Sequence, residues 1–172
     1  MNRIAVIFAS LTFTGAFLTS AIQITHASEP GITKLNANAN ARMMVNHKRA
    51  QSHRLVVQVD VNDPAIMNLA LNNVSNTVQH YAEIGQKVEV ELVAFGPGLH
   101  MLRDDTSPVK ARIKSMSETM PQVAFSACGN TKENMARTEA KDIPLISQAK
   151  LTKSGVVRLM ELQEQGWSYL RP

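Results

Sequence analysis

One thiol stands where a nucleophile can be stabilised as an anion. Cys128 is the only cysteine in the 172 residues, and it follows an apolar, strand-like run over residues 122–127. Asn130 and Thr131 come directly after it, and side chains of this kind begin helices. The free N–H groups and the positive dipole end of a first helical turn favour a negative charge. A cysteine placed there is therefore a candidate for the thiolate form, which is the nucleophilic form.

A single cysteine cannot build an intrachain disulfide framework. Three roles remain for Cys128: an intermolecular disulfide, a reactive thiol, or an inert buried side chain. A lone cysteine is commonly a small core residue. The position between Ala127 and Gly129, at the tip of a strand, predicts a half-exposed thiol and keeps the reactive role open.

The elements that must position this thiol alternate between strands and helices. Apolar and β-branched runs predict strands at 55–61, 88–95, 122–127, 145–148 and 167–170. Helical spacing and capping residues predict helices that begin at Asn62 or Asp63 with Pro64 in the first turn, at 107–108, at Asn130 with Glu133 as a capping box, and at Thr152. Gly85 and Gly166 end the first and last of these helices.

This alternation predicts a three-layer α/β domain with a mostly parallel sheet and helices on both faces. Ligands of such sheets bind beyond the carboxyl ends of the strands. We therefore expect one rim at that edge, formed by Cys128, Asn62, Asp63, His100, Asn130 and Thr131. His100 would act there as a base or a cation for the thiol. Capping alone also explains the asparagines and Asp63, and His100 also fits an exposed loop.

Several chemistries have no matching motif in the chain. The run from Gly96 to Gly98 lacks the spacing of a dinucleotide or phosphate loop. There is no G-x-S-x-G, H-E-x-x-H or C-x-x-C, and the histidines outside the first 27 residues do not pair at zinc-ligand spacing. The sequence predicts no cofactor and no metal.

The amino-terminal third has the composition of an export signal and a spacer. Arg3 precedes an uncharged apolar run over residues 4–17, and Thr25 and Ala27 fit a cleavage site, so residues 1–27 are predicted to be a cleavable signal peptide. The apolar run is shorter than the about 20 residues of a spanning helix. Residues 28–51 are polar and low in complexity, which predicts a flexible linker before a folded domain at 52–172.

Export predicts a periplasmic protein with no membrane association after cleavage. The net charge is +4, but the basic residues are scattered along the chain, so no nucleic-acid partner is expected.

Four blocks together resemble one family. They follow each other in order along the chain: 63–64 with 68–73, then 93–99, then 125–131, and finally 155–157 with 162–172. These blocks are similar to those of the DsrE/DsrF-like proteins. The resemblance implies a flavodoxin-like fold of the DsrE/YchN type, assembled into trimers or hexamers. It also implies sulfur relay, in which one cysteine carries a persulfide between partners, and Cys128 takes the place of that cysteine.

The leading expectation is an exported protein in which Cys128 carries or senses reactive sulfur, with a donor or acceptor protein or a small thiol as partner. Two alternatives stay open. The chain could be a small-ligand-binding module in which Cys128 lines the site, or an assembly module with a structural cysteine. The sequence does not decide whether the protein turns over a substrate.

Overall fold

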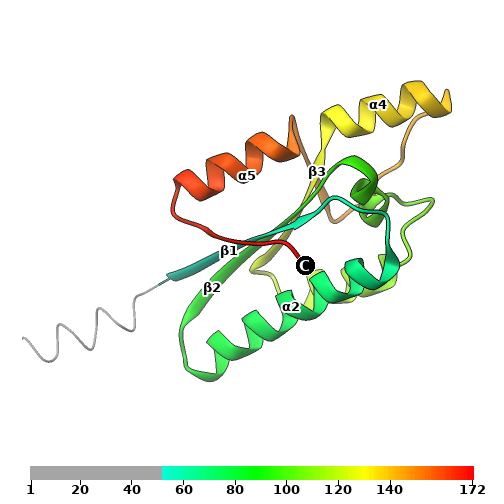
Figure 1. Cartoon of the computed structure of the whole chain (residues 1–172). Helices are drawn as coiled ribbons and strands as arrows, with labels where there is room; N and C mark the ends of the chain where they lie inside the picture. The colour runs from blue at the N-terminus through cyan, green and yellow to red at the C-terminus, as the bar shows by residue number, and fades with distance from the viewer. Residues whose placement is uncertain (1–51) are drawn as a thin grey trace, which may run out of the picture. The chain divides into compact units, whose positions relative to one another are not determined.

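In the computed structural model, which describes residues 52–172, a parallel sheet lies between helices (Figure 1). The predicted signal peptide (1–27) and linker (28–51) lie outside these residues. The elements follow in the order β1 (Ser52–Val59), α2 (Pro64–Glu83), β2 (Lys87–Ala94), the 3-10 helix η1 (Gly96–Leu102), α3 (Lys110–Thr119), β3 (Val123–Cys128), α4 (Gly129–Glu139), β4 (Ala149–Thr152), α5 (Gly155–Glu164) and β5 (Ser168–Leu170).

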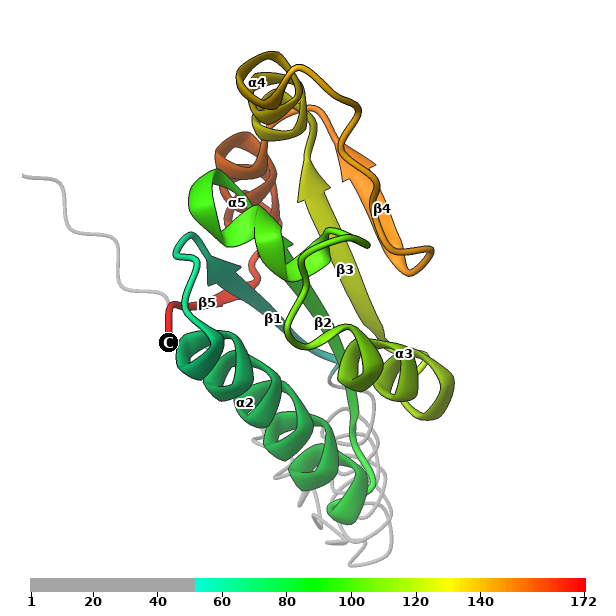
Figure 2. The same cartoon turned by 90° about the vertical axis from the view of Figure 1, so that its right-hand side faces the viewer.

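The sheet has five parallel strands in the order β4-β3-β2-β1-β5. Figure 2 shows α2 and α3 together on one face, and α5 lies on the other. The predicted three-layer α/β domain, flavodoxin-like in its layers, is therefore confirmed. No helix in the part of the chain described by the structure is both long and apolar enough to cross a membrane.

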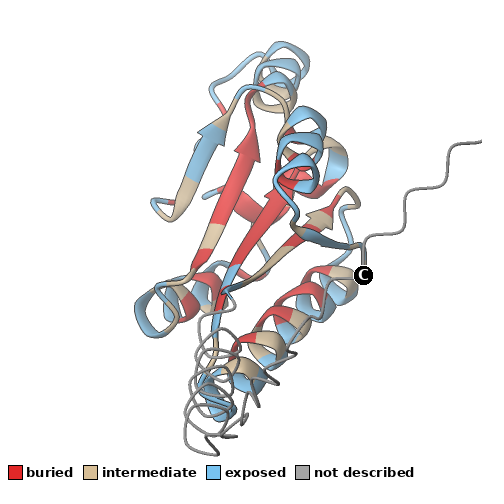
Figure 3. Ribbon diagram, turned by 90° about the vertical axis from the view of Figure 1, so that its left-hand side faces the viewer, coloured by how far each residue is buried: buried red, intermediate tan, exposed pale blue. Residues whose placement is uncertain are grey.

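The larger core lies between the sheet and α2 and α3. Alternate residues of the central strands point into it, because successive side chains of a strand point to opposite faces. From α2 it receives residues at helical spacing: Met67, Ala70, Leu71, Val74 and Val78. Figure 3 shows the buried stretches on β2 and β3, whereas the edge strand β4 is mostly open to solvent.

The smaller core lies between the sheet and α5. Val56 and Val93 of the sheet meet Leu159 and Leu162 of the helix there, and the side chains of Phe95 and Trp167 pack against them. This cluster has four buried members, and the buried polar side chains of Glu91 and Ser126 lie on the same face of the sheet.

The connections that leave β3 and β4 run along opposite faces of the sheet. After β3 the chain enters α4, whose Met135 packs against the larger core on the side of α2 and α3. After β4 it enters α5 on the opposite face. Adjacent parallel strands that lead to opposite faces form a topological switch point, the usual place for a ligand in open α/β sheets. Cys128 and Thr152, the last residues of β3 and β4, are register partners at this point.

One of the predicted strands was wrong, and the starts of α3 and α5 shifted. No strand forms over 145–148: Leu145 makes one isolated antiparallel bridge to Arg103, and β4 begins at Ala149. An edge strand pairs on one side only, and the outward side of this one carries polar residues and an exposed Leu151, so its pattern did not stand out. The last helix begins after the cap Ser154 rather than at Thr152, and α3 begins at Lys110 rather than at 107–108.

β2 ends at Ala94, and Gly96, Pro97 and Gly98 begin η1. Gly98 lies against the end of β1, and a Cβ atom there would come within 2.2 Å of the Val59 carbonyl oxygen. This close approach brings the segment after β2 onto the segment after β1.

Candidate functional site

Cys128 lies at the carboxyl end of β3 and is also the N-cap residue of α4. Strand alternation places its side chain on the α5 face with Ser126, since Phe125 and Ala127 point into the larger core. Its exposed fraction is 5%. The expectation of a half-exposed thiol is therefore wrong, because the starts of two helices close over the strand tip.

Two helices begin beside this thiol. α4 starts at Gly129, and α5 starts after Ser154, two residues beyond Thr152, the register partner of Cys128. The backbone N–H of Asn130 donates to the carbonyl of Lys153 over 3.1 Å and joins the two helix starts. A Cβ atom at Gly129 would lie 3.0 Å from the Thr152 carbonyl oxygen, so the close approach depends on a glycine. Both helix dipoles thus direct their positive ends toward this edge.

The predicted rim forms only in part. The Thr131 hydroxyl accepts a hydrogen bond from the N–H of Gly96 over 3.0 Å, so the segments after β2 and β3 do meet. Asp63 is the cap of α2, because its carboxylate accepts from the N–H of Ala65 over 2.7 Å. Asn62 is exposed at the same helix start.

His100 and Asn130 do not contribute as expected. His100 bonds through Nδ1 to the hydroxyl of Thr106 at 2.9 Å, within its own loop. The capping box of Asn130 and Glu133 does not form, because Cys128 takes the N-cap position and both residues lie inside the exposed first turns of α4. The cap moved because β3 runs one residue further than its apolar pattern, through Cys128.

Sequence reasoning missed a polar network on the same face as Cys128. Glu91 of β2 accepts hydrogen bonds from Arg158 of α5, at 2.8 Å from Nε and 2.7 Å from Nη2. The Ser126 hydroxyl donates to the same carboxylate over 2.6 Å. Glu91 and Ser126 are buried, whereas Arg158 is about one-third exposed. The network therefore joins β2, β3 and α5 beneath the helix.

The electrostatics of this network keep Glu91 charged. Burial alone raises the pKa of the Glu91 carboxyl, but the hydrogen bonds from Arg158 and Ser126 and the positive charges of Arg158 and Lys150 outweigh burial and leave the pKa below its usual value. The hydrogen bond to Glu91 raises the pKa of Arg158. The run 88–95 carries two carboxylates, Glu89 and Glu91, and only Glu91 is buried, but its partner lies 67 residues further on.

The Glu91 network positions the thiol and does not supply a general acid or base next to it. Ser126 precedes Cys128 by two residues on the same strand face, so the network fixes the part of β3 that carries the thiol. Arg158 lies in the first turn of α5, so its pair with Glu91 fixes the start of that helix over the sheet. Residues 52–172 contain no group of three or more side chains placed to hold a metal ion.

Comparisons with known proteins agree on the fold and are silent on activity. No family model and no curated protein matches the chain. Among solved structures, the protein of unknown function MTH1491 from Methanobacterium thermoautotrophicum is similar, with 29% sequence identity and a TM-score of 0.59. The match covers 70% of this chain and 99% of that protein. This similar protein supports the three-layer fold. Because its function is unknown, the comparison says nothing about the role of Cys128.

Proposed function

We propose that this protein is an exported member of the DsrE/DsrF-like group, and that Cys128 carries or senses reactive sulfur. The observation that carries the proposal is the place of the thiol at the switch point between β3 and β4, where α4 and α5 both begin. Two helix starts direct their positive dipole ends toward one sulfur. Export to the periplasm would place this thiol among small thiols and oxidants.

The proposed step is a transfer between two sulfur atoms. The Cys128 thiolate attacks the outer sulfur of a hydropersulfide donor, and the sulfur–sulfur bond of the donor breaks as the new one forms. The donor leaves as a thiolate and takes up the proton of its former outer sulfur. The products are the Cys128 persulfide anion and the donor thiol, and no further oxidant is needed.

Access to the thiol requires a local opening. With 5% of Cys128 exposed, a donor cannot reach the sulfur unless the turn between β4 and α5 moves. That turn consists of Lys153 and Ser154, and Lys153 is exposed. Local openings of this kind occur far more often than global unfolding, so the proposal predicts that native Cys128 reacts faster than the protein unfolds.

The test is intact-mass analysis of the full chain after treatment with cysteine hydropersulfide. We expect a gain of about 32 Da on the native wild-type protein, the mass of one sulfur atom, reversed by a reductant. Because Cys128 is the only cysteine, Cys128→Ser is the matched control and should gain nothing. The rate of alkylation, measured beside the rate of global unfolding, shows whether the thiol reacts in the folded state. Labelling only at the unfolding rate would exclude a carrier or sensor.

Stability of Cys128→Ser cannot substitute for that test. The buried site offers the serine hydroxyl no assured partner, so we expect a loss of about 1–3 kcal/mol whether or not the thiol is reactive. The labelling experiment is the one that separates the two roles.

A closed homo-oligomer, a trimer or hexamer, is the second part of the proposal. The outward face of α5 supports it, because Val156, Val157 and Met160 are each about half exposed there while Leu159 and Leu162 fill the inner face. A helix that is apolar on both sides is typical of a buried element. Light scattering of the full chain at micromolar concentration should give a multiple of the chain mass, and Val157→Glu should reduce it. A monomeric wild type would exclude assembly.

A small-ligand-binding module remains the second candidate function. The observation that favours it is a pocket between α2 and the amino end of β1, at the edge of the sheet opposite to Cys128.

A further inference from the structure

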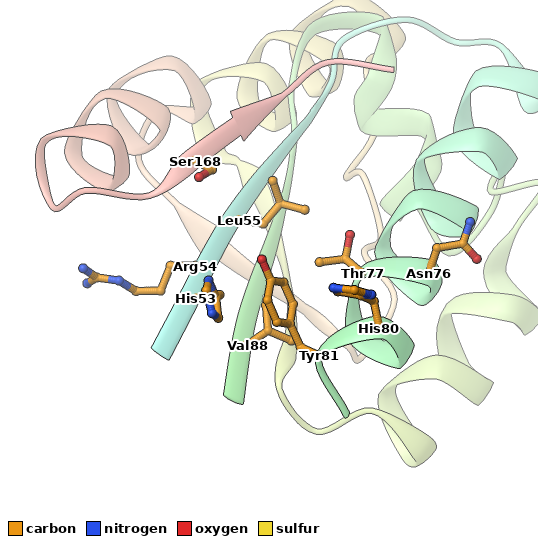
Figure 4. Close-up of a pocket in the computed structure, with 9 residues that line it drawn as sticks. All are labelled: His53, Arg54, Leu55, Asn76, Thr77, His80, Tyr81, Val88 and Ser168. Atoms are coloured by element: carbon orange, nitrogen blue, oxygen red, sulfur yellow. The ribbon is translucent and has the colours of Figure 1, made fainter. Parts of the chain in front are cut away.

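The pocket between α2 and β1 has no part in the sulfur chemistry proposed above. It has a volume of about 420 Å³, within the range of small-molecule sites. Leu55 and Val88 form its apolar floor, and Asn76, Thr77, His80 and Tyr81 of α2 form one wall (Figure 4). Ser168, the first residue of β5, closes the far side.

The pocket exists because β5 is short. β5 pairs with β1 only from Leu55 to Val57, so the amino end of β1 has β2 as its partner on one side and no strand of the described chain on the other. The side of the sheet edge next to His53 is thereby open, and α2 passes along it without filling the space.

A flat aromatic wall is the first feature that selects a ligand. The rings of His53 and Tyr81 are stacked with centroids 4.0 Å apart and planes at 17°, and the ring of His80 meets Tyr81 edge-on at 5.2 Å. Gln86 fixes the stack, since its side-chain oxygen lies 2.7 Å from Nε2 of His53. Rings held in this way present a rigid surface to another planar group.

The polar groups around this wall are the second feature. Among the described residues, no hydrogen bond engages the side chains of Asn76, His80, Tyr81 or Ser168, and all four line the same pocket. The Asn76 amide and the two hydroxyls can each donate a hydrogen bond. A ligand that accepts several hydrogen bonds fits this set.

Charge is the third feature. The ionisable side chains that line the pocket are His53, Arg54, His80 and Tyr81, and no carboxylate is among the lining residues. The guanidinium of Arg54 points away from Tyr81 in Figure 4 and lies 6.0 Å from the Trp167 ring, so it contributes a positive field without closing the pocket. This excess of basic side chains in the lining favours a ligand with an anionic group over a cation.

We propose that this pocket binds a small planar organic acid, whose ring packs over Leu55 and Val88 against Tyr81 and whose carboxylate meets Asn76 and His80. Cys128 does not line this pocket, so binding of the acid can be tested independently of the sulfur chemistry.

The test compares three probes with one ring and different charge. Benzoate, benzamide and benzamidine are titrated into the full chain, and binding is followed by two-dimensional NMR of the amides of α2 and β1. We expect saturable binding of benzoate with a dissociation constant on the order of millimolar, as for a fragment of this size. Benzamide should bind at least about tenfold more weakly, and benzamidine should not bind.

The variant Asn76→Asp reverses the charge preference with almost no change of shape at an exposed position. Benzoate affinity should fall by at least about tenfold, and benzamidine should begin to bind. The matched control is Asn134→Asp on the exposed surface of α4, which should leave benzoate binding unchanged. No shifts with benzoate, equal affinity for benzoate and benzamide, or an Asn76→Asp variant that binds benzoate normally would each overturn the proposal.

Discussion

Two arginine–carboxylate networks stabilise this domain, and they bury opposite partners. Arg103 is 1% exposed, while its partners Asp105 and Glu139 are 28% and 31% exposed. In the network beside Cys128 the carboxylate is the buried partner: Glu91 is 7% exposed and Arg158 is 31% exposed. A buried guanidinium cannot give up its charge, so it needs charged partners for its donors, whereas a buried carboxyl group such as Glu91 stays charged only while its partners outweigh burial.

The buried arginine is accordingly the more completely paired. Nε and Nη2 of Arg103 donate to both oxygens of Asp105 at 2.9 and 2.8 Å, and Nη1 and Nη2 donate to Glu139. Nη1 also contacts the sulfur of Met135. These hydrogen bonds raise the pKa of Arg103 and lower those of both acids. The network joins the end of η1 to α4, and we infer a purely structural role.

The two networks also differ in the elements that they connect. The Glu91 network joins β2, β3 and α5, which include the strand of Cys128 and the helix that covers it. One network therefore closes a loop region, whereas the other ties the strand of Cys128 to the helix that begins beside it. Comparing variants of the two separates loss of stability from loss of function.

Arg103→Met should have the largest effect on stability. It leaves two carboxylates without their common partner and removes the link between η1 and α4. Because both acids are partly exposed and regain some water, we expect the free energy of unfolding to fall by about 3 kcal/mol, at the lower end for a broken buried pair. Chemical denaturation measures it. Reactivity of Cys128, corrected for stability, should stay the same, and a selective change in reactivity would contradict the structural role.

Glu91→Gln should cost less stability and affect Cys128 more. Glutamine keeps the shape and can still bond Ser126, but Arg158 loses its charged partner and can turn toward water. We expect a loss of about 1–2 kcal/mol and a native alkylation rate of Cys128 that rises several-fold as α5 loosens. Arg158→Met, which leaves a buried carboxylate unpaired, should be the more destabilising of the two. Equal reactivity in the wild type and both variants would show that the network does not control access.

Acid should weaken both networks, and the two carboxylates paired with Arg103 should account for most of the lost stability. The folded-state pKa values of Asp105, Glu139 and Glu91 are lowered, that of Glu139 to about 2, so their stabilisation is complete above the unfolded-state values and is lost as pH falls from about 4.5 toward about 2. The midpoint of urea unfolding, followed over this range, should fall in the wild type. The fall should be shallower in Arg103→Met, and equal slopes would contradict the assignment.

Removal of residues 28–51 should have the smallest effect. The segment is polar and has no apolar periodicity, so neither network nor the core needs it. We expect the melting temperature of the shortened chain, measured by differential scanning calorimetry, to stay within about 2 °C of that of the chain without residues 1–27. A larger fall would mean that the segment packs on the domain.

The sequence allowed prediction of the elements that depend on neighbouring residues, but not of the two networks. β-branched runs and Pro64 after Asp63 were sufficient to predict β1, α2 and the alternation of strands and helices, because these signals act over a few residues. β4 was misplaced because the apolar pair Leu145 and Ile146 packs in the larger core from a loop, while the strand itself pairs at an open edge. The Glu91 and Arg103 networks were missed, since each depends on partners more than 30 residues away.

By itself, the sequence determined the class of the fold and the place of Cys128 at the end of a strand, since backbone preference, side-chain alternation and capping are local. Only the tertiary structure decided that the thiol is buried, that two helices begin beside it, and that His100 bonds within its own loop. It also decided where the pocket of His53 and Tyr81 forms. Burial and pocket shape depend on which distant segments the sheet brings together, and no stretch of sequence carries that information alone.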